Sequence, residues 1–450
     1  MRKCFCLFFL VFLLITGCGD DNITPFTVSP FYIEPYLQNV TQNSITVEWW
    51  TDTEEKNNYV MYGSSFEYSE AATDEYITET GKYLHRAVIS NLAPQTAYKY
   101  RVHSGTVTGK EYVFHTSVNE MNNFHFAVLG DGRTDNDEII TRHRSITQVA
   151  MKQGIDFAVH TGDFVTLGVQ EYWDRFMRRI VTTSDPNDPG IAFASNVPYY
   201  LVMGNHEDSD GKGNTENSFK LFNDYTDPPL NNSANPLWNK CYYSFTYGVA
   251  TFISINSSAN YLPAGSVPGW KEGSEQYTWL VSELEKAKNN SVFTFIIIHE
   301  SPYCRGEGGE PDDRNHAWDL RVLDPLFRQY SVDGVFSSHD HLVEHCLTGP
   351  AGFEANMDKK DPANLNYIVM GDSGITSQNA QQGWESWMSV KGNSLPPFYT
   401  TYFYDWAQST HCSFLDVRIE KQSDSIWRCT CKIIRDDGNI FDEFYFERSR

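Results

Sequence analysis

Five apolar, strand-like runs in this 450-residue chain each end on side chains that can bind a metal ion. The last run, Val332 to Phe336, leads into Ser337-Ser338-His339-Asp340-His341, where two imidazoles stand one residue apart. A His-x-His pair alone is a weak signal, although each ring at a strand end can offer one nitrogen to an ion. The four earlier segments are Leu129-Gly130-Asp131-Gly132-Arg133, His160-Thr161-Gly162-Asp163, Met203-Gly204-Asn205-His206-Glu207 and Ile298-His299-Glu300-Ser301-Pro302. Ligands gathered at strand ends predict a layered α/β domain.

Strand and helix patterns alternate through the same part of the chain. The predicted strands are Phe124–Leu129, Ile155–His160, Tyr199–Met203, Val292–Ile298, Gly334–Ser337 and Tyr367–Met370. One predicted helix begins after a cap at Asp135 or Asn136. Three others are predicted over Gln170–Val181, Ser274–Lys288 and Trp318–Tyr330. A polar insert runs to about Lys240, a hairpin is expected over Tyr242–Ile255, and the tail reads as antiparallel strands over Phe414–Ile419 and Trp427–Ile434.

The N-terminal part of the chain has a different pattern. Between Pro25 and Ser117 there are short alternating runs and no convincing helix, and Ile45, Val47 and Trp49 fall on one face of a strand. A chain of this length exceeds one small core, so two domains are expected. We predict an all-β sandwich over residues 25–118 and the α/β domain over residues 122–450.

The first residues are typical of an export signal. Arg2 and Lys3 precede an apolar run, Phe5 to Ile15, that is too short to span a bilayer comfortably. Ile15-Thr16-Gly17-Cys18 resembles the lipobox of bacterial lipoproteins. The resemblance implies cleavage after residue 17, a lipid anchor on Cys18, a tether over residues 18–24, and an exported protein at the periplasmic face or the cell surface. A plain secretory signal and an uncleaved anchor are the alternatives.

The charge of the chain restricts its partners. Removal of Arg2 and Lys3 with the signal changes the formal net charge from −23 to −25. That balance argues against nucleic acid as a partner, because phosphate backbones would be repelled. A small anionic substrate stays compatible if bound cations reverse the field locally.

Six cysteines follow Cys18, and an even number in an exported chain suggests disulfides. Cys304 and Cys346 each lie five residues beyond a candidate ligand, His299 and His341 respectively. We therefore expect a bridge between these two cysteines if the two strand ends are neighbours.

The candidate ligands are too many for one ion. Two carboxylates, one amide oxygen and three imidazoles suit two ions that share a bridging carboxylate. These ligands are Asp131, Asp163, Asn205, His299, His339 and His341. Two cations ~3.5–4 Å apart can clamp a phosphate and activate water. His206, beside Asn205, is placed to protonate a leaving alkoxide.

Taken in order, the five motifs resemble those of the calcineurin-like metallophosphoesterases. Within them the chain is most similar to purple acid phosphatases, because a β-rich domain resembling fibronectin type III precedes the motifs and His299-Glu300-Ser301-Pro302-Tyr303 forms the fourth. The resemblance implies an α/β/β/α sandwich and a binuclear centre of Fe, Zn or Mn. It implies that Asp163 bridges the ions, that Asn205, His299 and His339 complete one, and that Asp131 and His341 serve the other.

Two positions depart from the family pattern. Purple enzymes carry a metal-binding tyrosine where this chain has Thr166, and related enzymes often carry histidine where it has Arg133. The ion that Asp131 and His341 would serve therefore lacks one protein ligand. Solvent, Thr166 and Asp135 are candidates to complete it, and weak binding is the alternative. Arg133 either contacts the substrate phosphate or pairs with a nearby acid.

The expected function is hydrolysis of phosphate esters by in-line attack of a metal-bound hydroxide, with small phosphomonoesters favoured. His206 and Arg133 are the catalytic candidates, and the resemblance places His316 and Arg321 near the substrate. A phosphodiesterase on the same site is one alternative. A cell-surface binding lipoprotein with weakened catalysis is the other, because one ion is short of a ligand.

Overall fold

The computed structural model describes residues 31–183, 190–257, 268–304, 316–348, 364–375 and 411–449. The predicted signal, Cys18 and the tether over residues 18–24 lie outside these ranges. Among the residues that are described, no helix has both the length and the apolar character needed to cross a membrane.

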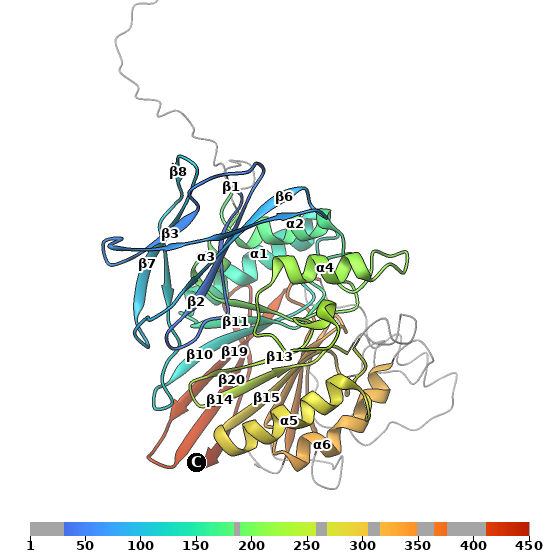
Figure 1. The fold of residues 1–450 in the computed structure, drawn as a ribbon. Helices are drawn as coiled ribbons and strands as arrows, with labels where there is room; N and C mark the ends of the chain where they lie inside the picture. Colours follow the sequence, from blue (N-terminus) through green and yellow to red (C-terminus); the bar gives the residue numbers. More distant parts are fainter. Residues whose placement is uncertain are drawn as a thin grey trace, which may run out of the picture.

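The N-terminal domain is a β-sandwich, as predicted, made of two antiparallel sheets (Figure 1, blue). One sheet has the order β1-β2-β6-β5, and the other has the order β4-β3-β7-β8 with β9 also paired to β7. The strands are β1 (Phe31–Gln38), β2 (Ile45–Thr51), β3 (Tyr59–Gly63), β4 (Tyr68–Ala71), β5 (Thr73–Ile77), β6 (Lys82–Ile89), β7 (Ala97–Ser104), β8 (Val107–Thr108) and β9 (Tyr112–His115). Every residue of β2 is buried, because Ile45, Val47 and Trp49 fill the sandwich while Trp50 stacks on Tyr225 of the next domain.

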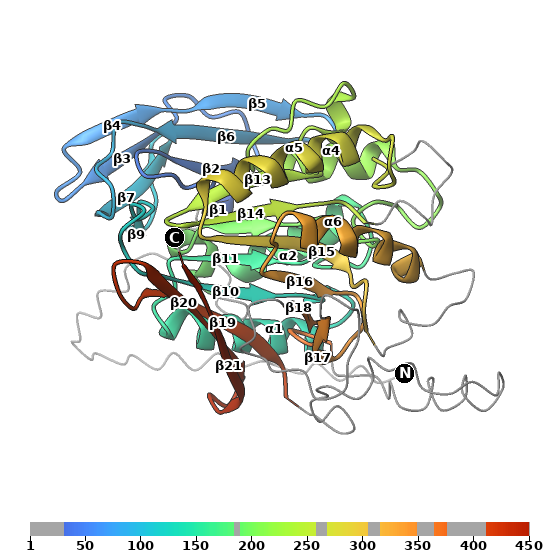
Figure 2. The same ribbon diagram turned by 90° about the horizontal axis from the view of Figure 1, so that it is seen from below.

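The second domain contains two six-stranded sheets. In the first, β12 (Tyr199–Leu201), β11 (Phe157–His160) and β10 (Phe124–Leu129) are parallel, and β19 (Ser413–Lys421), β20 (Ile426–Arg435) and β21 (Ile440–Ser449) extend it antiparallel. Figure 2 shows these red strands beyond β10. The second sheet has the order β13 (Tyr243–Tyr247), β14 (Ala250–Ser254), β15 (Phe293–Glu300), β16 (Gly334–Ser338), β18 (Leu365–Met370) and β17 (Val343–Thr348).

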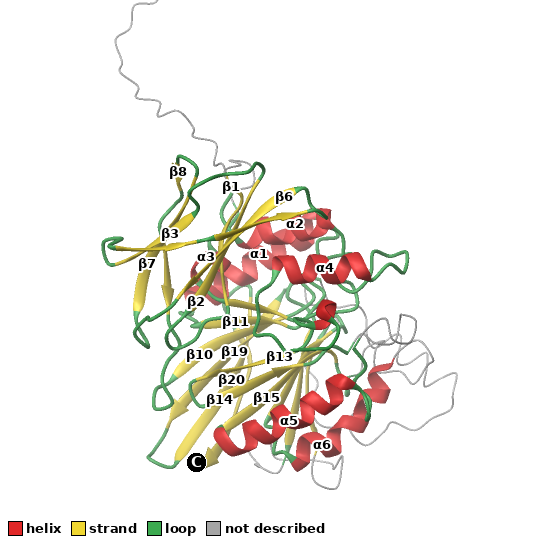
Figure 3. Cartoon of the chain, in the orientation of Figure 1, coloured by secondary structure: helices red, strands yellow, loops and turns green. Residues whose placement is uncertain are grey.

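Helices cover the two outer faces, which gives the predicted α/β/β/α order (Figure 3). One group comprises α1 (Asp137–Lys152), α2 (Gln170–Ile180), α3 (Phe193–Asn196) and α4 (Glu216–Tyr225). The other comprises α5 (Glu275–Asn290) and α6 (Asp324–Gln329), and two 3-10 helices, η1 (Pro236–Trp238) and η3 (His316–Leu323), lie in connections. Strand β10 shows how the layers form: Phe126 and Val128 enter the aromatic core between the sheets, while Ala127 and Leu129 face α1 and α2.

The predicted bridge between Cys304 and Cys346 is wrong. Neither cysteine forms a disulfide, and neither do Cys241, Cys412, Cys429 and Cys431. Strands β15 and β16 are neighbours, but Cys346 lies on β17, which pairs with β18 at the edge of the sheet. Two strands therefore separate Cys346 from β15, and the Cys304 thiol donates instead to the carboxylate of Asp340.

Candidate metal centre

The motif loops of both sheets meet at the carboxyl ends of β10, β11, β12, β15 and β16. Gly130, after β10, lies where this meeting is tightest. A Cβ atom at Gly130 would stand 2.4 Å from Thr161 Oγ1 and 2.7 Å from the Met370 carbonyl oxygen. A side chain there would push the two sheets apart, so glycine is required for the loops to converge.

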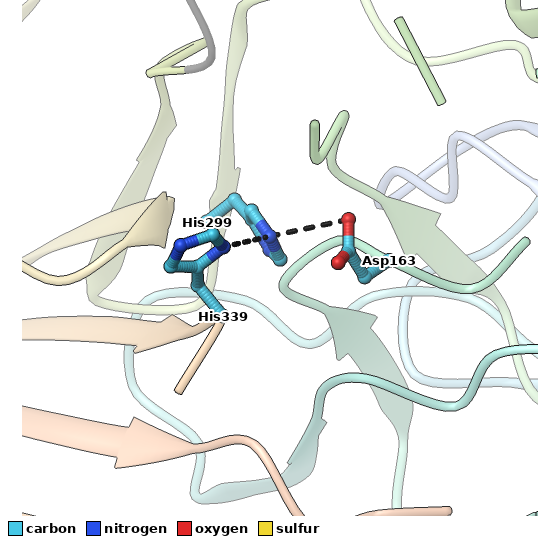
Figure 4. Close-up of side chains that lie close together, drawn as sticks. All are labelled: Asp163, His299 and His339. Carbon is cyan, nitrogen blue, oxygen red and sulfur yellow. Dashed lines mark hydrogen bonds and ion pairs between the residues drawn. The ribbon is translucent and has the colours of Figure 1, made fainter. Parts of the chain in front are cut away.

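Four donor atoms converge on one point of this edge. Asn205 Oδ1 lies 3.0 Å from His299 Nε2 and 3.0 Å from His339 Nδ1. His299 Nε2 lies 3.2 Å from His339 Nδ1 and 3.2 Å from Asp163 Oδ1. Figure 4 shows His299 and His339 beside Asp163. Ligands ~2.0–2.2 Å from a tetrahedral ion stand at similar separations from one another, so this donor set fits a metal ion.

The histidines present the correct nitrogen for this purpose. His299 Nδ1 donates to the Thr161 carbonyl at 3.0 Å, so Nε2 is the ring atom that faces the other ligands. Burial opposes the charge of His299, but the neighbouring Asp163 raises its pKa to about 10, so a bound ion would replace the proton on Nε2. Burial, followed by the positive charge of His299, lowers the pKa of His339 to about 3. Burial, followed by the charge of Arg133, lowers the pKa of His341 to about 4. Neutral imidazoles are the form that binds metals.

The second group of donors lies around Asp131. Its Oδ1 atom is 3.6 Å from His341 Nε2 and, although buried, accepts no hydrogen bond from any residue that the structure describes. Its Oδ2 atom accepts from the backbone N–H of His339 at 2.8 Å. Burial raises the pKa of Asp131 well above its usual range. A buried carboxylate oxygen without a partner is costly, and a cation between Asp131, Asp163 and His341 would satisfy it.

The backbone at the ligands is strained. Asp131, Asp163 and His339 have φ angles of 53°, 55° and 72°, a region that non-glycine residues rarely adopt. Such strain persists only where the surroundings enforce it, and it is common at functional sites.

Glu207 helps to hold this strained backbone in place, a role that was not predicted from the sequence. Its buried carboxylate accepts from the backbone N–H groups of Asp163 at 2.8 Å, Val165 at 3.0 Å and Gly204 at 2.7 Å. It thereby ties the loop after β11 to the loop after β12. Its place in the Gly-Asn-His-Glu motif was the available signal, although one sequence cannot show that its partners are backbone groups.

His206 has a fixed ring orientation at the edge of the centre. Its Nδ1–H donates to the Thr166 carbonyl at 2.6 Å, and its Nε2 lies 3.7 Å from Asp163 Oδ2. The side chain is 27% exposed, so the ring borders both the donors and solvent. Nε2 is therefore the ring atom that faces the donors, and in this structure it accepts from Arg133.

Arg133 has both an acidic partner and a place in the site. Its Nε and Nη2 atoms donate to Asp135 Oδ2 at 3.1 and 2.9 Å. This is the pairing with a nearby acid that the sequence offered as one of two roles for Arg133. Its Nη1 atom donates to His206 Nε2 at 2.6 Å. Thr166 faces Thr134, with 3.1 Å between the hydroxyl oxygens.

The two predicted substrate residues lie on η3. Arg321 donates from Nε to the Pro302 carbonyl at 2.7 Å, and its guanidinium lies 4.7 Å from the centre of the Tyr303 ring. These contacts support the loop that follows His299. The side chain of His316 lies outside the described part of the structure, so a substrate contact by either residue stays a prediction.

A further residue of the site, Arg179 on α2, was not predicted. Its side chain is buried, and it donates from Nη1 to the Arg133 carbonyl at 2.9 Å and from Nη2 to the Gly132 carbonyl at 2.6 Å. In the sequence it reads as an ordinary helix arginine.

Comparisons with known proteins agree with this geometry. Residues 124–343 match the family model described as calcineurin-like phosphoesterase, and residues 30–116 match the purple acid phosphatase N-terminal domain. Acid phosphatase type 7 of Mus musculus is 27% identical over 381 residues, which covers 78% of each chain. Purple acid phosphatase 21 of Arabidopsis thaliana is 27% identical over 395 residues, covering 82% of this chain and 80% of the relative.

Solved structures show the same fold. A purple acid phosphatase from yellow lupin (Lupinus luteus) seeds superposes with a TM-score of 0.69 at 19% identity, over 93% of this chain and 74% of the other. The structure of PhoD gives a TM-score of 0.65 at 12% identity, over 94% and 91%. The chain therefore contains a calcineurin-like phosphoesterase domain that follows a purple acid phosphatase N-terminal domain, and acid and purple acid phosphatases are among its relatives.

Proposed function

We propose that this protein is a metal-dependent phosphomonoesterase that acts on small phosphorylated substrates. The observation that carries the proposal is the donor set at the sheet edge, where each of four ligand atoms lies 3.0–3.2 Å from at least one other, beside an Asp131 oxygen without a hydrogen-bond partner among the described residues. The calcineurin-like phosphoesterase domain and the similarity to purple acid phosphatases support two ions at this place. Asn205, His299, His339 and Asp163 would hold one ion, and Asp131, His341 and Asp163 the other.

The residues divide the work of hydrolysis. When bound, two such ions supply Lewis-acid polarisation of the phosphoryl group and a water that ionises near neutral pH. Asp163, in the loop after β11, would contribute a ligand to both ions. His206, whose Nδ1–H is committed to Thr166, can hold or deliver a proton at the leaving oxygen only through Nε2, the atom that accepts from Arg133 Nη1 before substrate binds. Glu207 holds the loop of Asp163 and the loop of Asn205 at a fixed position relative to each other.

The first experiment measures turnover of aryl phosphate monoesters after loading with Mn²⁺, Zn²⁺ or iron, with metal content measured on the same samples. We expect about two ions per chain and turnover with at least one metal. His206→Ala should lower kcat by about 100-fold or more at nearly unchanged stability, because general acid catalysis contributes on this scale.

His103→Asn is the matched control, since His103 lies on β7 and hydrogen-bonds to Thr108 and the Gly105 carbonyl, far from the motif loops. It should retain full activity. A wild-type protein that binds two ions and hydrolyses no phosphate ester would overturn the proposed function.

We also propose that the protein is an exported lipoprotein anchored through Cys18. The lipobox-like Ile15-Thr16-Gly17-Cys18 and the basic start of the chain support this placement. Metabolic labelling with a radioactive fatty acid should mark the wild-type protein in the membrane fraction, and Cys18→Ser should remove both label and anchor. A labelled Cys18→Ser protein would contradict the assignment.

A further inference from the structure

Arg133 occupies a position between a carboxylate and the candidate proton donor. Its Nε and Nη2 atoms contact Asp135 Oδ2, and its Nη1 atom contacts His206 Nε2 at 2.6 Å. The same Nε2 atom stands 3.7 Å from Asp163 Oδ2, within the donor cluster. Arg133 is thus one hydrogen bond away from the group that borders the proposed ions, and its side chain is 18% exposed, so solvent reaches it.

The loop that carries Arg133 is held rigidly. Arg179 binds the carbonyl groups of Gly132 and Arg133, and Arg175 donates to the Thr134 carbonyl at 3.3 Å. Asp135 fixes one side of the guanidinium fork. A cation positioned in advance loses little conformational entropy when an anion arrives, so this arrangement favours binding.

The guanidinium retains unused donors. A guanidinium carries five N–H bonds, and the contacts to Asp135 and His206 leave N–H groups on both Nη1 and Nη2 without a partner among the described residues. A purely structural ion pair is a weaker explanation. With Arg133 18% and Asp135 23% exposed, solvent screens the pair and weakens its contribution to stability.

Given the proposed function, we infer that Arg133 binds the substrate phosphate and selects monoesters over diesters. A phosphomonoester has three terminal oxygens, so two ions can engage two of them and leave the third to the guanidinium. A diester has an alkoxy or aryloxy group in place of that oxygen, and this group cannot accept a charge-assisted pair of hydrogen bonds. The bound oxygen competes with His206 for Nη1, while Asp135 keeps the guanidinium in place.

The test compares p-nitrophenyl phosphate with bis(p-nitrophenyl) phosphate on metal-loaded protein. Arg133→Gln should lower kcat/KM for the monoester by about 10- to 100-fold, the range expected for a hydrogen bond to a charged group, and lower that for the diester much less. Arg133→Lys should recover only part of the loss, because an ammonium is a point charge without the planar fork. Calorimetric titration with inorganic phosphate should show a matching loss of affinity at unchanged metal content.

Two further variants keep the inference falsifiable. Arg142→Gln is the matched control: it breaks the 2.6 Å Arg142–Glu138 pair on α1, in which the arginine is 22% exposed, and it should leave both esters and phosphate binding unchanged. Asp135→Asn keeps Arg133 but releases it, so KM for the monoester should rise. The inference would be overturned if Arg133→Gln lost activity equally on both esters. It would also be overturned if phosphate affinity were unchanged in both Arg133→Gln and Asp135→Asn. Wild-type protein that carries two ions but is inactive on both esters would instead overturn the proposed function.

Discussion

Thr166 determines what the metal centre should look like in solution. Its carbonyl orients His206 and its hydroxyl contacts Thr134, so no phenolate oxygen stands at this position. We predict that the iron-loaded protein has no visible tyrosinate-to-iron charge-transfer band, in contrast to purple enzymes with tyrosine here. An absorption spectrum recorded before and after iron removal checks this. A visible band that disappears with the iron would contradict it.

At the scale of single residues, the sequence revealed side chains whose chemistry is specific and concealed those that act through the backbone. Asp131, Asp163, Asn205 and the histidines could be chosen because their types and strand-end positions suit metal ions. Glu207 and Arg179 could not be assigned, because their partners are backbone N–H and carbonyl groups that a motif does not reveal. For Arg133 the sequence allows two roles, and in the structure its guanidinium contacts both an acid, Asp135, and the candidate catalytic residue His206.

At the scale of elements, helix α2 holds the loop after β10, which carries Asp131, through the side chain of Arg179. Burial lowers the pKa of this arginine to about 9, so the buried cation is itself unfavourable and its two carbonyl contacts offset that cost. We predict that Arg179→Met changes overall stability modestly but weakens metal binding at the Asp131–His341 site about 10- to 100-fold, the usual effect of losing support behind a ligand. Metal content after dialysis against graded chelator measures this.

Arg178 provides the control on the same helix. Its guanidinium lies over the Tyr32 ring at 4.8 Å and donates to the Tyr32 carbonyl, so it faces the sandwich rather than the metal loops. Arg178→Met should therefore leave metal affinity unchanged. Equal metal affinity in the Arg179→Met and wild-type proteins would show that α2 does not support the site.

The elements themselves were predicted where their hydrophobic period was strong. Helix α1 starts at its Asn136 cap, and α5 starts after Ser274, as the sequence indicated. Helix α4 was missed because it lies in a segment rich in polar residues, and its buried side chains become informative only against α2 and the sandwich. The segment around Trp318–Tyr330 is a 3-10 helix followed by a short α-helix with proline in its first turn, which a single helical period could not distinguish.

At the scale of the whole molecule, the sandwich is joined closely to the helices of the second domain (Figure 1). Tyr100 donates to the Ser195 carbonyl at 2.7 Å, and the backbone N–H of Val113 donates to Asn196 Oδ1 at 3.0 Å. Trp50 stacks on Tyr225 with 4.6 Å between ring centres. These contacts lie on α3 and α4, so the sandwich supports the helix layer behind the first sheet. The sequence predicted two domains, but contacts between distant segments could not be read from it.

A charged group crosses this interface and makes the coupling testable. Arg86 Nε lies 2.5 Å from Glu48 Oε1 within the sandwich and 3.6 Å from Asp227 Oδ1 in the second domain, where Lys240 lies 3.5 Å from the same oxygen. The Glu48 side chain is 0% exposed, so it depends on Arg86 for compensation. We predict that Arg86→Met lowers the free energy of unfolding by about 3 kcal/mol, the lower end for breaking a buried pair because Arg86 is partly exposed.

The pH dependence of this loss distinguishes an electrostatic cause from lost packing. Burial raises the pKa of Glu48, and Arg86 opposes that rise. Without Arg86 the folded protein holds the Glu48 proton more tightly than the unfolded chain does, whose glutamate pKa is about 4.3. Stability of Arg86→Met should therefore fall, relative to wild type, as the pH rises above that value, with a larger deficit at about pH 8 than at about pH 5. Denaturant unfolding at both pH values measures it, and adding Glu48→Gln should recover part of the loss by removing the buried charge. A deficit that is equal at both pH values and unchanged by Glu48→Gln would mean that Arg86 acts through packing alone.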